Sequence, residues 1–167
     1  FLIMLDNTSK LKFYHIEDRN VVMEHKSDNP ILRFFCNKNG TKIIFQHQNG
    51  EVNLFFPATE TYYHIKLVTD RVDKVLWDNE NPNEFAIVNG NQAFSYVICR
   101  SNIYGNVVTP VREILSLEKV ETEEGDPSMT KVEKNVISLS QGNIFFMGGA
   151  AINYITLTSH AFLNNYT

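Results

Sequence analysis

The chain of 167 residues is 43% hydrophobic and 20% charged, which is typical of globular material with a sizeable core. Its formal net charge of −4 argues against a surface that follows nucleic-acid phosphates, because such a surface needs clustered Lys and Arg. No apolar run approaches the roughly 18 residues of a membrane span, and the start of the chain lacks the length and basic flank of a signal peptide. Since the chain begins with Phe and not Met, we expect a segment of a longer protein.

The first predicted strands cover residues 2–5, 11–16 and 21–24, with polar turns between them at 6–9 and 17–20. Short apolar runs bounded by polar turn residues are typical of β-strands. We expect them to be the last three strands of a four-stranded unit whose opening strand lies upstream.

The second unit follows the break at Asn29-Pro30, and its strands are predicted at residues 31–37, 43–45, 52–56 and 62–65. It is the most complete unit in the chain and provides the pattern against which the others are compared.

Two dipeptides in this unit, Asn39-Gly40 and Asn49-Gly50, are strong hairpin signals, since both residues tolerate the positive φ of a tight two-residue turn. Between residues 52 and 56 the alternation of apolar and polar residues fails, because Val52, Leu54, Phe55 and Phe56 are all apolar. This pattern predicts a sheet that is covered on both faces.

Further strands are predicted at residues 72–77, 85–88 and 93–98 in a third unit. Residues 106–120 are compatible with an outer strand or a short amphipathic helix, and we expect the strand. The last unit has predicted strands at 136–140, 144–147 and 152–158, with Gly148-Gly149 as a hairpin turn.

Residues 121–134 form an acidic insertion before the last unit, with Glu121, Glu123, Glu124 and Asp126 close together and Pro127 following. Because this segment has little apolar surface to offset its ordering entropy, it predicts a solvated loop. The alternative is an acidic docking loop, in which these four carboxylates contact a partner protein.

Two independent sets of positions repeat along the chain, each at the start of an apolar run. One set is Leu2, Ile43, Phe85 and Ile144, and the other is Leu11, Val52, Ala93 and Ile152. The intervals are 41, 42 and 59 residues in the first set and 41, 41 and 59 in the second. A four-stranded propeller blade takes about 40 to 45 residues, so the insertion explains the longer last interval.

We therefore predict an all-β fold, a WD40-like β-propeller with about four blades of four antiparallel strands. The expected blades are residues 1–28, 29–69, 70–120 and 135–163. They would be a segment of a larger ring, for which we expect about seven blades.

Trp77-Asp78 resembles the WD dipeptide of WD-repeat blades, but that dipeptide usually ends the third strand, whereas here it ends the first. We expect Trp77 to pack between adjacent blades.

Cys36, Cys99 and Trp77 also suggest an immunoglobulin domain, in which a disulfide packs on a tryptophan. The 41 residues from Cys36 to Trp77 are too many for that fold, so we expect two unpaired thiols in a reducing compartment.

No pattern of reactive residues indicates an enzyme. The histidines, including His15, His47 and His64 on predicted strands, are not spaced as zinc ligand pairs, and the glycines at 142–149 do not form a phosphate loop. The nucleophile elbow of serine hydrolases is also missing. We expect no catalytic residue, no cofactor and no metal site.

Four segments resemble, in order and spacing, the later blades of the second propeller in one family. These are KFYHIEDRNVV (12–22), NKNGTKIIF (37–45), VDKVLWDN (72–79) and YITLTSHAFL (154–163). The family comprises the WD-repeat subunits of intraflagellar transport complex A of the WD-repeat-containing protein nineteen type. The acidic insertion departs from the family pattern.

The resemblance implies a non-enzymatic scaffold of the cytoplasm, cilium and basal body, which supports retrograde ciliary transport and the ciliary entry of membrane cargo. The implied partners are the other WD-repeat and tetratricopeptide subunits of complex A, Tubby-like cargo adaptors and transport complex B. No catalytic or cofactor residue is implied.

The residues are also compatible with two other functions of a propeller. One is a propeller in another vesicle-coat or nuclear-pore-type scaffold, and the other is a propeller hydrolase or glycosidase. Carboxylates converging on a deep channel, with pKa values driven apart, would favour the enzyme.

Overall fold

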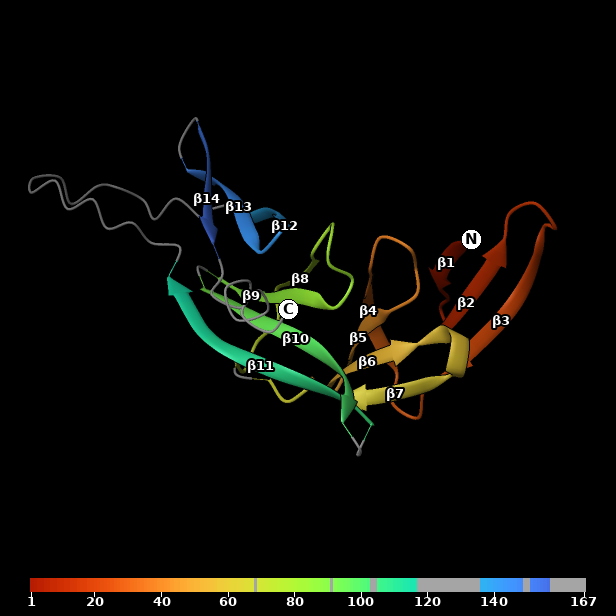
Figure 1. The fold of residues 1–167 in the computed structure, drawn as a ribbon. Helices are drawn as coiled ribbons and strands as arrows, with labels where there is room; N and C mark the ends of the chain where they lie inside the picture. Colours follow the sequence, from red (N-terminus) through yellow and green to blue (C-terminus); the bar gives the residue numbers. More distant parts are fainter. Residues whose placement is uncertain (68, 91, 103–104, 117–135, 149–150, 157–167) are drawn as a thin grey trace, which may run out of the picture. The chain divides into compact units, whose positions relative to one another are not determined.

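The computed structural model describes the chain except for residues 68, 91, 103–104, 117–135, 149–150 and 157–167. The described residues form four antiparallel sheets, and in each sheet neighbouring strands are consecutive in the sequence (Figure 1). The all-β prediction of repeated meanders is confirmed. The chain divides into two compact units, residues 1–67 and 68–167.

The first sheet contains β1 (Leu2–Leu5), β2 (Lys10–His15) and β3 (Asn20–Lys26) in that order. These strands match the predicted ones to within two residues. Leu11 and Phe13 of β2 are buried on one side of the sheet, as expected from the period of two along a strand.

The second sheet contains four strands in sequence order, and a short 3₁₀ turn precedes the last. They are β4 (Ile31–Cys36), β5 (Ile43–His47), β6 (Val52–Phe56), η1 (Pro57–Thr59) and β7 (Thr61–His64). Residues 52–55 of β6 are all buried, so both faces of this sheet are covered as predicted, and Phe56 is half-buried.

The two Asn-Gly turns of this sheet differ from the prediction. Positive φ occurs at Gly40 (68°) and Gly50 (89°) but at neither preceding asparagine. The Gly40 N–H donates to Asn37 O (3.1 Å) and the Gly50 N–H to His47 O (3.0 Å), so each loop is longer than two residues and has a left-handed glycine as its third residue. The expectation of positive φ at both central residues was wrong, because the loop length placed each asparagine in an ordinary turn position.

Such a two-residue turn does occur elsewhere in the described chain. Gln141 (φ 50°) and Gly142 (φ 70°) join strands whose last paired residues are Ser140 and Asn143. Mirror-image turns of this kind match the twist of the flanking strands.

The third sheet contains β8 (Lys74–Trp77), β9 (Glu84–Asn89), β10 (Gln92–Asn102) and β11 (Gly105–Ser116). The strand predicted at 106–120 is confirmed as β11. The last two strands have 11 and 12 residues, and β10 pairs with β9 only as far as Val97. The remainder of β10 pairs with β11, so this hairpin extends past the rest of its sheet.

The fourth sheet contains β12 (Val136–Ser140), β13 (Asn143–Gly148) and β14 (Ala151–Thr156). Its three strands agree with the predicted ones over the described residues. The turn predicted at Gly148-Gly149 and the segment 157–163 lie partly or wholly outside them. The boundaries of the blades and the insertion at 121–134 remain predictions.

Each unit has its own core between two consecutive sheets. In the first unit the core joins the first and second sheets and contains Leu11, Phe13, Ile31, Ile43, Phe45 and Phe55. In the second unit it joins the third and fourth sheets and contains Leu76, Ala86, Val88, Ala93, Val136, Leu139, Ile144 and Phe146. Packing between the faces of consecutive sheets is the arrangement expected of propeller blades.

Candidate functional site

The four carboxylates of the predicted docking loop, Glu121, Glu123, Glu124 and Asp126, lie outside the described residues. The docking loop therefore stays a hypothesis.

Asp78 is the buried carboxylate that connects two sheets of the second unit. It follows β8 directly, and only 2% of its surface is exposed. Its Oδ1 accepts hydrogen bonds from the backbone N–H groups of Glu80 (2.8 Å) and Asn81 (2.9 Å). Its Oδ2 accepts one from the Gly142 N–H (2.8 Å), in the turn between β12 and β13. One side chain thus orders its own turn and holds the turn of the next sheet.

Backbone contacts strengthen the same connection. Asp78 and Leu139 form an isolated parallel bridge, and the Asn79 N–H donates to Leu139 O (3.1 Å). At the other end of β8, Lys74 Nζ donates to Val136 O (2.9 Å). The polar contacts therefore fix the position of β12 against β8 independently of the apolar core.

The sequence pattern singled out Trp77, which is buried in its own sheet. The hydrogen bonds that join the two sheets are made by the next residue, Asp78. The Trp77 indole is 8% exposed and its ring centroid lies 5.2 Å from that of Phe85, which stacks on Tyr96 at 5.1 Å. A usable signal for Asp78 existed, since an aspartate followed within five residues by Asn79, Asn81, Pro82 and Asn83 is typical of a turn held by its side chain.

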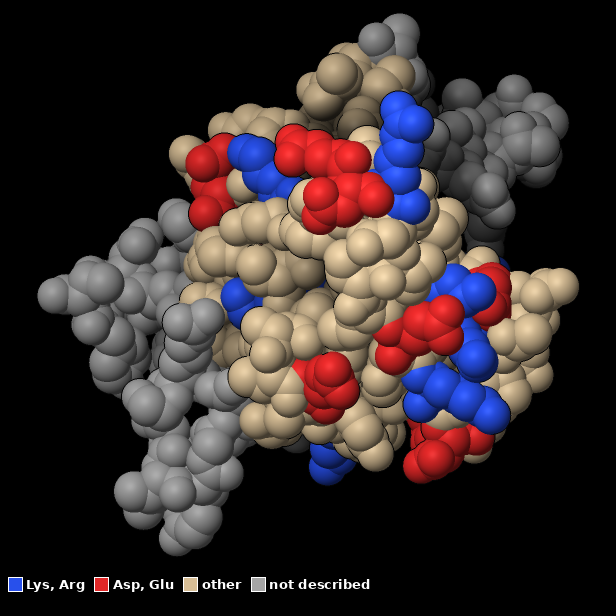
Figure 2. Space-filling model, turned by 90° about the vertical axis from the view of Figure 1, so that its right-hand side faces the viewer, with Lys and Arg blue, Asp and Glu red and all other residues tan. Residues whose placement is uncertain are grey.

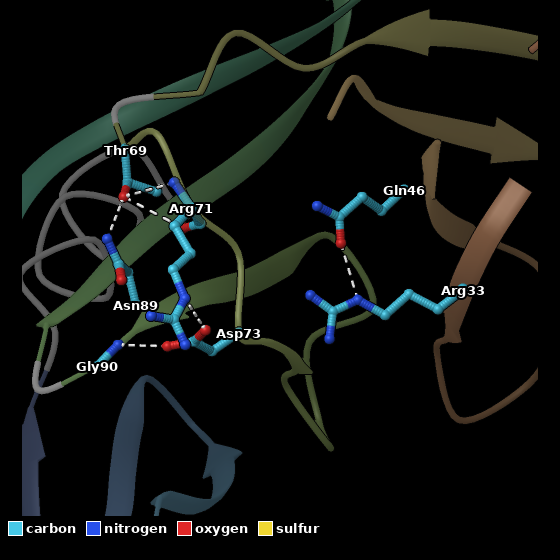
Figure 3. Close-up of polar contacts among 7 residues, drawn as sticks. All are labelled: Arg33, Gln46, Thr69, Arg71, Asp73, Asn89 and Gly90. Carbon is cyan, nitrogen blue, oxygen red and sulfur yellow. Dashed lines mark hydrogen bonds and ion pairs between the residues drawn. The ribbon is translucent and has the colours of Figure 1, made fainter. Parts of the chain in front are cut away.

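A second polar cluster holds the segment that leads into β8, and Figure 3 shows its members. Asp73 accepts hydrogen bonds from Arg71 Nε at Oδ1 and from the Gly90 N–H at Oδ2 (2.7 Å). Thr69 Oγ1 accepts from Asn89 Nδ2 and donates to Arg71 O (3.2 Å). The Arg71 side chain is 73% exposed, so its guanidinium is oriented by Asp73 but remains open to solvent.

Figure 3 also shows a separate pair in the first unit, in which Arg33 Nε donates to Gln46 Oε1 at 2.8 Å. The Arg33 guanidinium lies 5.5 Å from the centre of the Phe35 ring. This cation–π geometry gives the side chain a fixed direction along the second sheet.

The histidines of the first unit serve packing and local hydrogen bonds. His47 is 2% exposed, with Nδ1 3.0 Å from Asn29 O and Nε2 2.8 Å from Asn53 Nδ2. Both contacts are satisfied when Nδ1 carries the proton and Nε2 accepts from the amide. His25 packs on Phe55 at 4.3 Å, and its buried Nε2 has no hydrogen-bond partner among the described residues. Burial lowers the pKa of His25.

Charged side chains on the first sheet form a mixed surface. Lys12 Nζ lies 3.1 Å from Asp6 Oδ2 and 3.7 Å from Glu24 Oε1, and the Asp6 carboxylate raises the pKa of Lys12. The backbone N–H of Lys10 and the hydroxyl of Thr8 hold the pKa of Asp6 well below its usual value. In the face drawn in Figure 2, positive and negative side chains lie side by side. That face is unlike the basic surfaces that bind nucleic acid.

The described residues hold no group of three or more His, Cys, Asp or Glu side chains placed to bind a metal ion.

Cys36 is a free thiol, and burial raises its pKa to about 11, which disfavours the reactive thiolate. The disulfide of the immunoglobulin alternative is therefore wrong for Cys36. Among the helices of the described chain, none has the length and hydropathy to cross a membrane.

The sequence profile described as "WDR19 second beta-propeller" matches residues 1–122. WD repeat-containing protein 19 of Homo sapiens is 22% identical over 167 residues, which cover 99% of this chain and 12% of the human protein. The Mus musculus protein of the same name is 23% identical over 110 residues, covering 65% of this chain and 8% of that protein. The chain therefore spans about an eighth of the length of the human relative.

The fold also resembles the crystal structure of the Myceliophteria thermophila Cps50 (Swd1) β-propeller domain. The TM-score is 0.56 at 14% identity, with 90% of this chain and 48% of that chain covered. At this identity the similarity shows only that the two proteins share a fold. A propeller fold agrees with the packing of consecutive sheets face to face within each unit. With the profile match over 1–122, these findings show that the chain belongs to the WDR19 second β-propeller family and is a segment of such a propeller.

Proposed function

We propose that this chain belongs to a non-enzymatic scaffold propeller of intraflagellar transport complex A. It would support retrograde ciliary transport and the ciliary entry of membrane cargo through protein contacts in the cytoplasm, cilium and basal body. The observation that carries the proposal is membership of the WDR19 second β-propeller family. The partners proposed are the WD-repeat and tetratricopeptide subunits of that complex, Tubby-like cargo adaptors and transport complex B.

The hydrogen bonds of the buried polar groups support the proposal of a scaffold protein. Asp78 accepts three backbone hydrogen bonds, and His47 is held between Asn29 and Asn53. These groups have fixed structural partners, whereas a catalytic site needs groups directed at a substrate. Exposed groups on turns and linkers, such as the Arg71 guanidinium, remain for contacts with other proteins.

The proposal is tested by expressing the tagged full-length protein that contains this chain in a ciliated cell. We expect the protein in cilia and at basal bodies, with complex A subunits co-purifying at stoichiometric levels. A protein found outside cilia, without complex A subunits in the purified material, would contradict the proposal.

The acidic segment gives a second test, at the level of partner choice. We propose that Glu121, Glu123, Glu124 and Asp126 contact a partner, and that the combined change to Gln, Gln, Gln and Asn weakens its co-purification at least fivefold. Melting of the protein should stay unchanged. The control variant Glu17→Gln with Asp28→Asn removes exposed charges elsewhere and should keep all partners. Unchanged partner binding by the neutralised segment would assign it a solvating role only.

A further inference from the structure

Three asparagines of the chain are followed directly by glycine. The pairs are Asn39-Gly40, Asn49-Gly50 and Asn89-Gly90. Asparagine is among the chemically labile residues of proteins, because its side-chain amide can be lost to the backbone nitrogen of the next residue. Glycine in that next position favours the reaction, since it has no Cβ to hinder the approach of the nitrogen. Each of the three pairs is therefore a candidate site of spontaneous modification.

The reaction needs only the chain itself and water. The glycine nitrogen loses its proton to hydroxide and forms a bond to Cγ of the asparagine, while the bond from Cγ to Nδ2 breaks and ammonia leaves with a proton from water. Water then adds to either carbonyl of the resulting five-membered succinimide ring and opens it. The product is aspartate, or isoaspartate with the main chain passing through Cβ. Either product adds a negative charge at neutral pH.

Two of the pairs occupy turns of the second sheet with the same backbone arrangement. In both turns the glycine adopts positive φ, and its N–H donates to the carbonyl three residues earlier, at 3.1 Å for Gly40 and 3.0 Å for Gly50. Asn39 and Asn49 are both exposed. Because backbone geometry and access to water are alike, a difference in reactivity between these two sites has to come from the asparagine side chains.

The Asn49 side chain is held by the residue that follows its turn. Its Nδ2 donates to Glu51 Oε2 (2.9 Å), and its Oδ1 accepts from the Glu51 N–H (3.1 Å). Asn29 Nδ2 donates to the same carboxylate oxygen (3.1 Å) and fixes it. The Asn49 side chain has to leave these partners before Cγ can turn to the Gly50 nitrogen. Each hydrogen bond lowers the population of the released form about 2- to 10-fold.

The corresponding contacts are missing at Asn39. Thr41 stands where Glu51 stands in the other turn, and its hydroxyl accepts instead from Asn37 Nδ2 (3.0 Å). Among the described residues, the Asn39 side chain has no hydrogen-bond partner. Asn37 is buried, and its Oδ1 accepts from the Lys42 N–H (3.1 Å), which closes the loop below Asn39. A change at Asn39 therefore affects the tip of the turn and spares the pairing of the strands.

At the third pair, both reacting groups are engaged. Asn89 is half-buried, and its Nδ2 donates to Thr69 Oγ1. The Gly90 N–H donates to Asp73 Oδ2 (2.7 Å), in the cluster drawn in Figure 3. The side chain and the attacking nitrogen are thus both held by other partners, and this site is protected.

We propose that Asn39 is the site at which the folded protein undergoes spontaneous deamidation, whereas Asn49 and Asn89 are protected by their hydrogen bonds. The product is an aspartate or isoaspartate at the tip of the turn between β4 and β5, next to Lys38. Because Asn37 keeps the loop closed, the modified form accumulates as folded protein. This turn therefore gains a negative charge as the molecule ages.

The test follows the three sites in the full-length protein that contains this chain. Samples incubated at neutral pH are digested, and mass spectrometry measures the conversion of amide to acid at each asparagine, with chromatography separating the isoaspartyl from the aspartyl peptide. In the native protein, Asn39 should convert at least threefold faster than Asn49 or Asn89, because its side chain has no hydrogen bond to break. In urea the three rates should converge, since glycine follows each asparagine and the folded contacts are gone.

A variant tests the protection directly. Glu51→Ala removes the acceptor of Asn49 Nδ2, so the native rate at Asn49 should rise at least twofold while the rate at Asn39 stays unchanged. Glu17→Ala is the matched control, because it removes an exposed carboxylate from a turn of the first sheet and should alter neither rate.

Three results would overturn the proposal. They are equal rates at Asn39 and Asn49 in the native protein, a native order of rates that persists in urea, and an unchanged Asn49 rate in a folded Glu51→Ala variant. Thermal melting verifies that the variant is folded. The comparison of native with unfolded protein decides the matter by itself if Glu51→Ala does not fold.

Discussion

At the scale of single residues, the polar groups that matter most are those that hold backbone rather than those that resemble a catalytic motif. Asp78 accepts three N–H groups from two turns of the second unit, including the buried N–H of Gly142. A carboxylate is suited to this role because charge-assisted hydrogen bonds are shorter and stronger than neutral ones.

Replacing Asp78 with alanine is expected to lower the free energy of unfolding by roughly 2–4 kcal/mol. The reason is that the buried Gly142 N–H loses its acceptor, and an unsatisfied buried group costs about 1–3 kcal/mol before the turn contacts are counted. Urea titration followed by Trp77 fluorescence measures the loss. Asp28→Ala, at an exposed position, should change the value by less than about 0.5 kcal/mol. Equal effects of the two substitutions would refute the role of Asp78.

His25 predicts a dependence of stability on pH. Burial lowers its pKa in the folded protein, the nearby His47 lowers it further and Glu60 opposes the shift. The unfolded chain therefore binds the proton more readily than the folded chain. The stabilising contribution of neutral His25 is complete above the unfolded pKa of about 6.5 and declines as the pH falls towards the lower pKa of the folded state.

We expect the urea midpoint of the native chain to decrease between about pH 7.5 and 5, and the slope to become smaller in His25→Phe. Phenylalanine keeps a ring against Phe55 but cannot titrate. Identical slopes for the two proteins would show that His25 does not contribute.

At the scale of elements, the turns contain two kinds of residue with positive φ. Some are glycines, and others have a side chain and adopt the left-handed conformation at a cost in energy. Gly50 has φ of 89° with open space where a Cβ would lie, so only its backbone conformation opposes substitution. Arg19 adopts φ of 53° although it has a side chain.

Gly50→Ala should destabilise the chain by about 1 kcal/mol, and Arg19→Gly should leave it unchanged or slightly more stable. Both effects follow from the cost of about 1–2 kcal/mol for an L-residue in the left-handed region. Thermal melting of the two variants beside the native chain provides the measurement. A stabilised Gly50→Ala variant would contradict the assigned backbone conformation.

Much of the strand pattern could be predicted because apolar runs and polar turns alternate clearly. The anchors Leu11, Val52, Ala93 and Ile152 occupy equivalent register positions in four sheets. The turn geometry could not be predicted from Asn-Gly alone, since it depends on where the pairing of the flanking strands ends. The role of Asp78 depends on Gly142, which is 64 residues away, and local patterns contain no information on that pairing.

At the scale of the whole molecule, two neighbouring strands carry isoleucines with opposite surroundings. Ile144 of β13 is fully buried in the core of the second unit, whereas Ile152 of β14 is 66% exposed. The sequence marked both as equal members of the repeat, because periodicity identifies apolar positions but not which of them are covered.

Ile144→Ala is expected to cost about 2–4 kcal/mol of stability through the cavity that it creates, and Ile152→Ala less than about 0.5 kcal/mol. Denaturant titrations of dilute protein would compare them. A large loss from Ile152→Ala would contradict the exposed position of its side chain.

The hydrogen bond from Gly142 to Asp78 also has a spectroscopic consequence. An amide proton whose nitrogen lies 2.8 Å from a carboxylate oxygen should resonate well downfield of ordinary amides, in an uncrowded part of a proton–nitrogen correlation spectrum. Its signal would report whether the third and fourth sheets are docked. One glycine resonance could therefore follow, in solution and without any introduced label on the side chains, how the second unit opens and closes.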